Sequence, residues 1–193
     1  MTSPTLPSVD RRIQRTRTAL RDALLMLMAQ HGWDNVSVQD ICDSANVGRS
    51  TFYVHFQSKE QLLTFSLDGL RIALGAQSDT HKAVNNQGLR FVRNLLVHIH
   101  GQRQLSRAIV GRRSSFVVQE RFRDLLMQLV DAEVPRMTPP QWQREASVHY
   151  IAASLWGLLT WWVDAAEPLP IDQLEALFQQ LTMPTLVYAS QQK

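Results

Sequence analysis

The sequence predicts an all-α protein made of an N-terminal three-helix domain with a helix-turn-helix and a second, C-terminal helical domain. Apolar residues recur at the spacing of one helix face along most of the 193 residues. Strand signals are nearly absent, since no Asn-Gly or Asp-Gly pair joins two runs of alternating Val, Ile, Thr and Tyr. Two short helical patterns, joined by a tight turn, follow a longer one near the N-terminus. The predicted organisation is a flexible arm at 1–9, a helix-turn-helix domain at 10–57 and a helical domain at 58–193.

Composition places the chain among globular proteins. Hydrophobic residues make up 45% of it, with eight glycines and eight prolines, which excludes disordered and low-complexity classes. The formal net charge is +3. The positive excess lies in residues 1–21, which hold five arginines and one acidic residue, Asp10. Net charge alone therefore does not indicate a nucleic-acid partner.

Cysteine content and hydropathy predict where the protein works. The single cysteine, Cys42, cannot form an internal disulfide or hold a zinc ion by itself. The N-terminal segment lacks the apolar stretch of a secretory signal. An uncharged run at 147–163 has 17 residues, fewer than the about 20 that a membrane span needs. We expect a cytoplasmic protein with no membrane association, metal or cofactor; a membrane-associated helix bundle anchored by that run is an alternative.

The first helix is predicted over about residues 10–30. Its apolar face is expected to bury Ile13, Leu20, Leu24, Leu27 and Met28. Gly32 follows at a position where a left-handed residue commonly ends a helix.

The next helix has a complete start signal. Ser37 and Asp40 stand three residues apart, as in a capping box, where each side chain accepts a hydrogen bond from the other's backbone N–H. Val36 and Ile41 occupy the positions of a hydrophobic staple. The elements expected from here are a short helix over 38–45, a turn at 46–48 and a second short helix over 49–56.

Helical patterns continue along the rest of the chain. Ser58 and Gln61 predict a second capping box, which opens a helix carrying Leu62, Leu63 and Leu70. A polar loop is expected at 77–88. Later helices are predicted over 89–100, 104–110, 116–134, 141–163 and 171–181, with prolines 135, 139 and 140 breaking the chain and Pro170 opening the last helix.

The two short helices have helix-turn-helix spacing. Helices this short are marginal alone, so they must pack on the first helix, with the second presenting a polar face to a major groove. Small residues, Cys42 and Ala45, stand where the helices cross, and Asn46 tolerates the left-handed conformation of the turn. Val47 and Phe52 are expected between the helices. The residues that remain to point outward are Gly48, Arg49, Ser50, Thr51, Tyr53 and His55.

The segment over 36–63 resembles the DNA-binding segment of the tetracycline-repressor (TetR) family of bacterial regulators. The recognition helix of that family follows a six-residue pattern: Thr, a hydrophobic residue, Tyr, any residue, His or Tyr, and Phe. Residues 51–56 match this pattern. The family also has a Lys-Glu pair shortly afterwards, which here is Lys59 and Glu60. The resemblance covers residues 13–63. Residues 64–193 share with the family only the all-helical character of its regulatory domain. The chain departs from the family at Cys42, usually Ala, and Asn46, usually Gly; both fit in size.

The resemblance implies a set of DNA contacts. The phosphate-contacting positions are Ser37, Gln39, Tyr53, His55 and Lys59, and the base-reading positions are Arg49, Ser50 and Thr51, next to Gly48. Arg49 suits a bidentate pair with guanine, worth about 1–3 kcal/mol of discrimination. The arginines at 11, 12, 15 and 17 add salt-sensitive contacts. Plain packing of Tyr53 and His55, and a solvated face for the arginines, are the alternatives.

The second domain is expected to dimerise. The helix over 141–163 is apolar almost all round, so it has to be covered on every side. The resemblance implies a homodimer in which the last two helices form a four-helix bundle, with Tyr150, Trp161, Trp162 and Phe178 at the interface. Such a dimer presents two recognition helices to a palindromic operator on double-stranded DNA. A monomer folded back on itself is the alternative.

The resemblance also implies that the second domain senses a small-molecule effector. The candidate ligand-binding residues are Phe91, Leu95, His98, Phe116, Phe122, Trp156 and Thr160. Apolar residues at helical spacing are in the first place core residues. His98 and His100 are not expected to share a metal, since side chains two residues apart diverge by about 200° on a helix.

The predicted function is a homodimeric transcriptional repressor that an effector releases or modulates. The sequence contains no Gly-rich phosphate loop or Glu-x-x-His pair, and no Ser/His/Asp or Cys/His arrangement that must converge. The chain is therefore not expected to be an enzyme. A small helical enzyme stays the rival hypothesis, which a pair of carboxylates in the core would favour.

Overall fold

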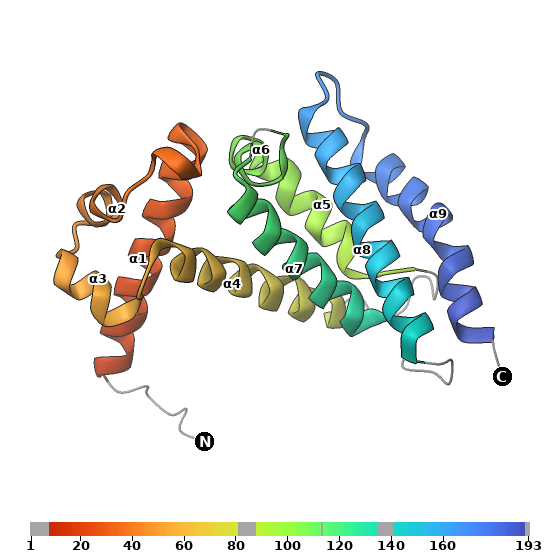
Figure 1. Cartoon of the computed structure of the whole chain (residues 1–193), viewed down its shortest axis with the longest axis horizontal. Helices are drawn as coiled ribbons and strands as arrows, with labels where there is room; N and C mark the ends of the chain where they lie inside the picture. Colours follow the sequence, from red (N-terminus) through yellow and green to blue (C-terminus); the bar gives the residue numbers. More distant parts are fainter. Residues whose placement is uncertain (1–7, 81–87, 113, 135–140, 192–193) are drawn as a thin grey trace. The chain divides into compact units, whose positions relative to one another are not determined.

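The computed structural model describes residues 8–80, 88–112, 114–134 and 141–191. Among these residues the regular secondary structure is entirely helical, as the sequence predicts (Figure 1). The elements are α1 (Ser8–His31), the 3-10 helix η1 (Trp33–Asn35), α2 (Val38–Ala45), α3 (Arg49–His55), α4 (Lys59–Thr80), α5 (Phe91–Gly101), α6 (Arg103–Val110), α7 (Phe116–Glu133), α8 (Gln141–Asp164) and α9 (Ile171–Gln191).

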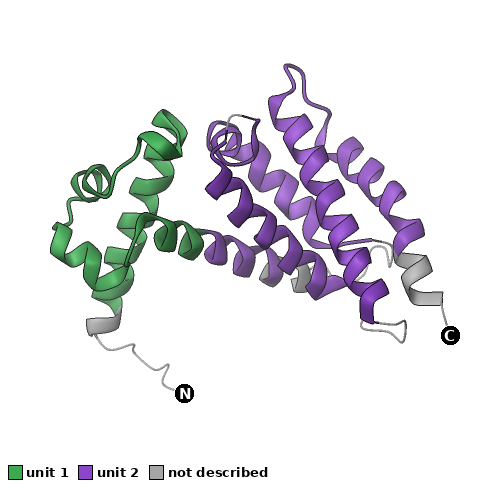
Figure 2. Cartoon of the chain, in the orientation of Figure 1, with its two compact units in different colours: residues 1–66 green, residues 67–193 purple. Residues whose placement is uncertain are grey.

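The chain divides into two compact units, residues 1–66 and 67–193 (Figure 2). The division falls within a helix, since α4 begins in the first unit and continues into the second. The predicted boundary between residues 57 and 58 lies just ahead of this helix.

The core of the first unit is built on α1. This helix packs against α2, and α2 packs against α3. The three helices bury Leu20, Leu24, Met28, Ile41, Cys42 and Phe52. Burial of one large apolar side chain contributes about 1.5–3 kcal/mol, so packing on α1 holds two helices that are too short to persist alone.

The start and end of α1 differ from the prediction. The helix begins at Ser8, within the predicted arm, whose residues 1–7 lie outside the described part of the chain. Ile13 is 36% exposed and Leu27 is only half-buried, because the spacing of apolar residues does not reveal where a partner helix ends. Gly32 has φ 76° and ψ 160°. It therefore has the predicted positive φ without the left-handed helical conformation, and it leads into η1.

The second unit is arranged around α8. This helix packs against α6, α7 and α9, and α5 packs against α9 (Figure 1). Its buried side chains include Ile151, Leu155 and Leu159. Predicted and observed ends agree closely for the helices from α5 to α8.

Two helix ends in this unit were predicted too early. The segment 77–80 belongs to α4 and not to a loop; the rest of the predicted loop, except Gly88, lies outside the described residues, as do prolines 135, 139 and 140. α9 continues ten residues past Leu181 and contains Pro184. A proline inside a helix removes one backbone hydrogen bond and usually ends the helix, but here the helix continues beyond it.

Side chains from α7 and α9 close the start of α5. The Glu133 carboxylate accepts hydrogen bonds from the backbone N–H groups of Arg90 (2.5 Å) and Phe91 (3.2 Å). The Gln179 amide accepts from the N–H of Leu89 (3.0 Å) and donates to its carbonyl (2.9 Å). Gly88 leaves room for this amide, because a Cβ there would overlap it. The N-terminal end of α5 is thus fixed by residues far away in the sequence.

Candidate nucleic-acid interface

The start of α2 is a complete capping box, as predicted. The Asp40 carboxylate accepts from the backbone N–H of Ser37 (2.8 Å) and from its hydroxyl (2.6 Å), and the N–H of Asp40 donates to that hydroxyl oxygen (3.2 Å). These hydrogen bonds from Ser37 lower the pKa of Asp40. Val36 and Ile41, the predicted staple, are both buried. The helix that supports the recognition helix is therefore fixed at its first turn.

The turn between α2 and α3 depends on Asn46. This residue has φ 51° and ψ 48°, and it is the non-glycine residue with positive φ in the described chain. Its N–H donates to the carbonyl of Asp43 (3.2 Å), and the N–H of Val47 donates to that of Cys42 (2.9 Å). The left-handed conformation predicted from the sequence is confirmed. It reverses the chain within three residues, so that α3 crosses α2.

α3 buries one side and exposes the rest. Phe52 is fully buried, whereas Arg49, Ser50 and Thr51 at the first turn are exposed. Tyr53 is 49% exposed and its ring is edge-on to Phe52. The base-reading candidates therefore share an open helix turn, while the rings behind them hold the helix on the core.

Arg49 and Tyr53 lie together on one side of α3. The guanidinium carbon of Arg49 is 5.9 Å from the centre of the Tyr53 ring. A hydrogen bond with Tyr53 raises the pKa of Arg49. Tyr53 thus helps to orient the guanidinium, since Arg stacks readily on aromatic faces. His55 is half-buried at the end of the helix, and its ring neighbours Phe56.

The two candidates at the start of α2 make hydrogen bonds within their own helix. Ser37 is occupied by the capping box, and the Gln39 amide donates to the Asp43 carboxylate (2.8 Å). Both side chains are exposed. Gly48 is exposed as well, and it precedes α3 in an extended conformation.

Lys59 has an internal role that the sequence does not reveal. Its ammonium donates to the carbonyls of Trp33 (2.9 Å) and Val36 (2.7 Å) and lies 4.2 Å from the centre of the Trp33 ring. Burial lowers the pKa of this ammonium. Two of its three donors bind the segment that precedes α2, so one donor remains for a phosphate.

The arginines of α1 divide into two groups. The guanidinium of Arg17 packs against two rings, 5.2 Å from the centre of Phe56 and 4.8 Å from that of Phe65. Arg11, Arg12 and Arg15 are exposed. Of the four arginines predicted to add salt-sensitive contacts, only these three therefore lie on a solvated face.

One exposed residue of α3, Val54, was not among the candidates. It is 79% exposed, although an apolar side chain in a helical pattern is normally assigned to the core. The sequence could have indicated this exposure, because Val54 comes two residues after the buried Phe52 and two residues span about 200° on a helix.

The comparisons with known proteins agree with this geometry. Residues 20–64 match the family model described as bacterial regulatory proteins, tetR family. This segment contains η1, α2 and α3 and most of the buried face of α1. This segment is a domain of the tetR family. The resemblance inferred from the sequence is confirmed.

Two curated relatives and one solved structure are similar to this chain. It is 26% identical over 181 residues, 89% of its length, to the uncharacterized HTH-type transcriptional regulator YxbF of Bacillus subtilis, and 42% identical over 48 residues, 25% of its length, to the probable acrEF/envCD operon repressor of Escherichia coli. These matches span only 46% and 22% of the two relatives. A TetR transcriptional regulator from Streptococcus agalactiae shares the fold, with 24% identity, a TM-score of 0.66, and 91% of this chain and 97% of that chain covered.

The predicted absence of enzymatic activity agrees with these matches, which are regulators and repressors. In the described part of the chain, no three His, Cys, Asp or Glu side chains gather as metal ligands would. None of its described helices, α8 included, is long and apolar enough to cross a membrane.

The ligand-binding candidates are not all in one place. Phe91, Leu95 and Phe122 are buried core residues, whereas Phe116 is 69% exposed. The Trp156 ring lies 6.1 Å from that of Phe122. The Thr160 hydroxyl donates to the carbonyl of Trp156 (3.0 Å), and burial lowers the pKa of His98.

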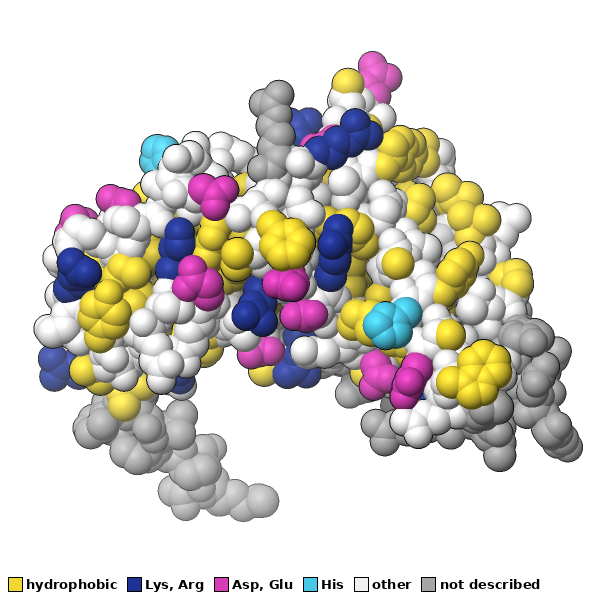
Figure 3. Space-filling view, viewed as in Figure 1, with side chains coloured by type: hydrophobic (Ala, Val, Ile, Leu, Met, Phe, Trp, Pro, Cys, Tyr) yellow, Lys and Arg dark blue, Asp and Glu magenta, His cyan; other side chains and the backbone are white. Residues whose placement is uncertain are grey.

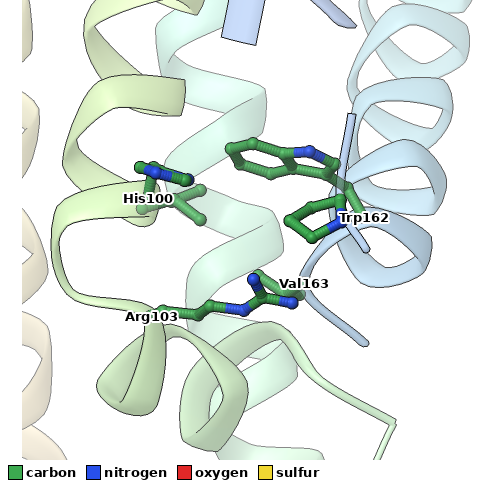
Figure 4. Close-up of a pocket in the computed structure, with 6 residues that line it drawn as sticks. His100, Arg103, Trp162 and Val163 are labelled. Atoms are coloured by element: carbon green, nitrogen blue, oxygen red, sulfur yellow. The ribbon is translucent and has the colours of Figure 1, made fainter. Parts of the chain in front are cut away.

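A pocket beside α5 and α8 is too small for an effector. It is lined by Ile99, His100, Arg103, Trp162, Val163 and Pro168 (Figure 4). The rings of His100 and Trp162 stack across it, with centres 5.9 Å apart. Its free volume of about 10 Å³ is close to the minimum for one water molecule.

The dimer-interface candidates are of two kinds. Trp162 and Phe178 are buried within the protomer, and the Trp162 indole N–H donates to the carbonyl of Leu169 (2.8 Å). Tyr150 and Trp161 are 59% and 47% exposed on α8. Only the second pair is available to a partner.

Proposed function

We propose that the protein is a homodimeric transcriptional repressor that binds a palindromic operator on double-stranded DNA, acts in the cytoplasm and responds to a small-molecule effector. The observation that carries this proposal is the open first turn of α3, held on a capped α2 and a buried Phe52. A short helix fixed in this way can enter a major groove with its N-terminal residues toward the bases. The name of the E. coli relative, an operon repressor, supports repression as the mode of action.

The proposed contacts follow from where the side chains lie. The residues assigned to bases are Arg49, Ser50 and Thr51, next to Gly48, and those assigned to the phosphate backbone are Ser37, Gln39, Tyr53, His55 and Lys59. Phosphate contacts fix the position of the helix, and base contacts supply the sequence preference. Lys59 has one donor for this purpose, since the other two hold the carbonyls of Trp33 and Val36.

The proposed dimer is supported by an exposed apolar face of α8 and α9. Hydrophobic side chains gather over these two helices (Figure 3). On α8 one line of exposed positions, three or four residues apart, holds three aromatic and three small side chains: Trp142, Ala146, Tyr150, Ala153, Gly157 and Trp161. On α9, Leu177 and Leu181 are exposed one turn apart. Two helices per protomer pairing around a two-fold axis would cover this face and present two copies of α3.

The effector site is proposed within the second unit. Trp156, His98 and Thr160 are its most suitable candidates, because they are half-buried and combine rings with polar atoms. Phe91, Leu95 and Phe122 would then form its floor as core residues.

Selection of binding sites from random duplex DNA with the purified full chain tests the proposal. We expect a palindromic site whose binding weakens as salt rises. Arg49→Ala should lower affinity for that site and relax one base preference, by about 1–3 kcal/mol. Tyr53→Phe should weaken binding to all duplexes about equally. If both variants select and bind the same site as the parent chain, the assignment of α3 as the reading element is wrong.

A further inference from the structure

Val54 is the most exposed large hydrophobic residue among those that the structure describes, at 79%. Single exposed apolar residues are common on protein surfaces and need no function. Val54 differs from them in its place, because it lies on α3, the helix that the proposed function inserts into the major groove.

The geometry of α3 places Val54 on its outermost line. With about 100° per residue, Ser50 and Val54 lie about 20° to either side of the direction opposite Phe52. Phe52 is fully buried, so this direction points away from the core of the unit. Arg49 and Tyr53 lie on one flank of the line and Thr51 on the other. Ser50 and Val54 are therefore the side chains that reach farthest from the core.

This line of α3 carries one hydroxyl group, from Ser50, and one apolar group, from Val54. A valine side chain cannot bind a phosphate or a polar base edge. The C5-methyl of thymine is an apolar group on a base edge in the major groove, and small apolar side chains contact it. A serine hydroxyl beside it accepts or donates with any base, so Ser50 adds affinity without competing for the methyl group.

We propose that Val54 is a specificity-determining residue that contacts the C5-methyl group of one thymine in each half of the operator. This inference rests on the proposed function, since it needs α3 in the major groove. The recognised group is the methyl, so 5-methylcytosine offers the same contact and deoxyuridine does not.

The test removes the methyl group and the side chain separately. Each thymine of one half of the selected operator is replaced in turn by deoxyuridine, and dissociation constants are measured by fluorescence anisotropy. We expect one position at which the parent chain loses about fourfold in affinity, the effect of one buried methyl group. Val54→Ala should still bind the operator, and its affinity should not fall when deoxyuridine replaces the thymine at that position. Replacing the same thymine by cytosine should weaken the parent chain, and 5-methylcytosine should restore part of the loss.

Matched variants keep the test decisive. Val97→Ala removes a valine that is 51% exposed on α5, and it should keep the deoxyuridine profile of the parent chain. Val54→Ser has no methyl group and serves where the alanine variant does not fold; it should likewise show no deoxyuridine sensitivity at that position. The inference is overturned if no thymine is sensitive in the parent chain, or if Val54→Ala keeps the same sensitive position. A parent chain that selects no operator overturns the proposed function itself, which is a distinguishable result.

Discussion

Lys59 couples the start of α4 to the segment that leads into α2. Its ammonium holds two backbone carbonyls, those of Trp33 and Val36, and lies against the Trp33 ring. These partners are more than twenty residues earlier in the chain. A lysine at the edge of the proposed interface therefore also fixes the internal geometry of the unit that carries α3.

Replacing Lys59 by Met should destabilise the protein. The substitution keeps much of the apolar stem but removes the ammonium donor from both carbonyls. The carbonyl of Trp33 keeps the N–H of Val36 (3.2 Å), whereas that of Val36 loses its side-chain donor, and an unsatisfied buried polar group costs about 1–3 kcal/mol. Urea unfolding should give this loss for Lys59→Met, while Arg11→Met, an exposed change on α1, should have almost none. Full stability together with weaker binding to every duplex would instead make Lys59 a phosphate contact alone.

His98 should make stability depend on pH. Burial lowers its pKa in the folded protein, so the unfolded chain takes up the proton first as the pH falls below about 6.5. Stability is therefore lost between that pH and the lower pKa of the folded state, with a slope of at most about 1.4 kcal/mol per pH unit. Thermal melts of the parent chain and His98→Gln between pH 7 and 5 test this, and identical curves would show that His98 does not contribute.

At the scale of elements, the residues at the ends of α2 and α3 contribute more to the stability of these helices than their length does. α2 has eight residues and α3 has seven, both below the length at which helices persist alone. A capping box begins α2 and the left-handed Asn46 ends it. Together with packing on α1, these ends keep the outer face of α3 in one orientation.

Ser37→Ala should weaken the α2 cap and lower stability by about 1 kcal/mol. The change removes the acceptor for the N–H of Asp40 and a donor to its carboxylate. Ser44→Ala, an exposed change on the same helix, is the matched control. Chemical denaturation of both variants gives the comparison, and equal midpoints would mean that the cap contributes nothing.

The elements that sequence alone predicted well are those set by local chemistry. The bounds of α2, its capping box and the conformation of Asn46 follow from residues within a few positions of one another. The capping box predicted at Ser58 is only partly present: its hydroxyl accepts from the N–H of Gln61 (3.3 Å), whereas the Gln61 side chain accepts from Gln57.

Features set by distant contacts were not predictable in this way. The stacking of Arg17 on two phenylalanines and the carbonyl contacts of Lys59 depend on how α1, η1 and α4 meet. The burial of Trp162 within the protomer depends on the segment leading into α9. A hydrophobic pattern predicts that a side chain is buried, but it does not predict which helix, or which copy of the chain, covers it.

At the scale of the whole molecule, Trp161→Glu tests the proposed dimer. A charge on the exposed face of α8, near its C-terminal end, cannot be buried against a second apolar face without a large desolvation penalty. We expect a monomer by light scattering and operator affinity reduced by at least tenfold, since one recognition helix remains per particle. Phe116→Glu changes another exposed aromatic side chain, on α7, and should leave the mass of the parent dimer unchanged. A parent chain that is itself monomeric would remove the basis for two-fold operator binding.

The continuity of α4 has a practical consequence. The border between the two units falls inside a run of backbone hydrogen bonds that extends from Lys59 to Thr80. Proteases cut where the backbone can open locally, and this border is helical. Limited digestion should therefore release no fragment ending near residue 66, and an expression plasmid that stops there would truncate a helix after its second turn.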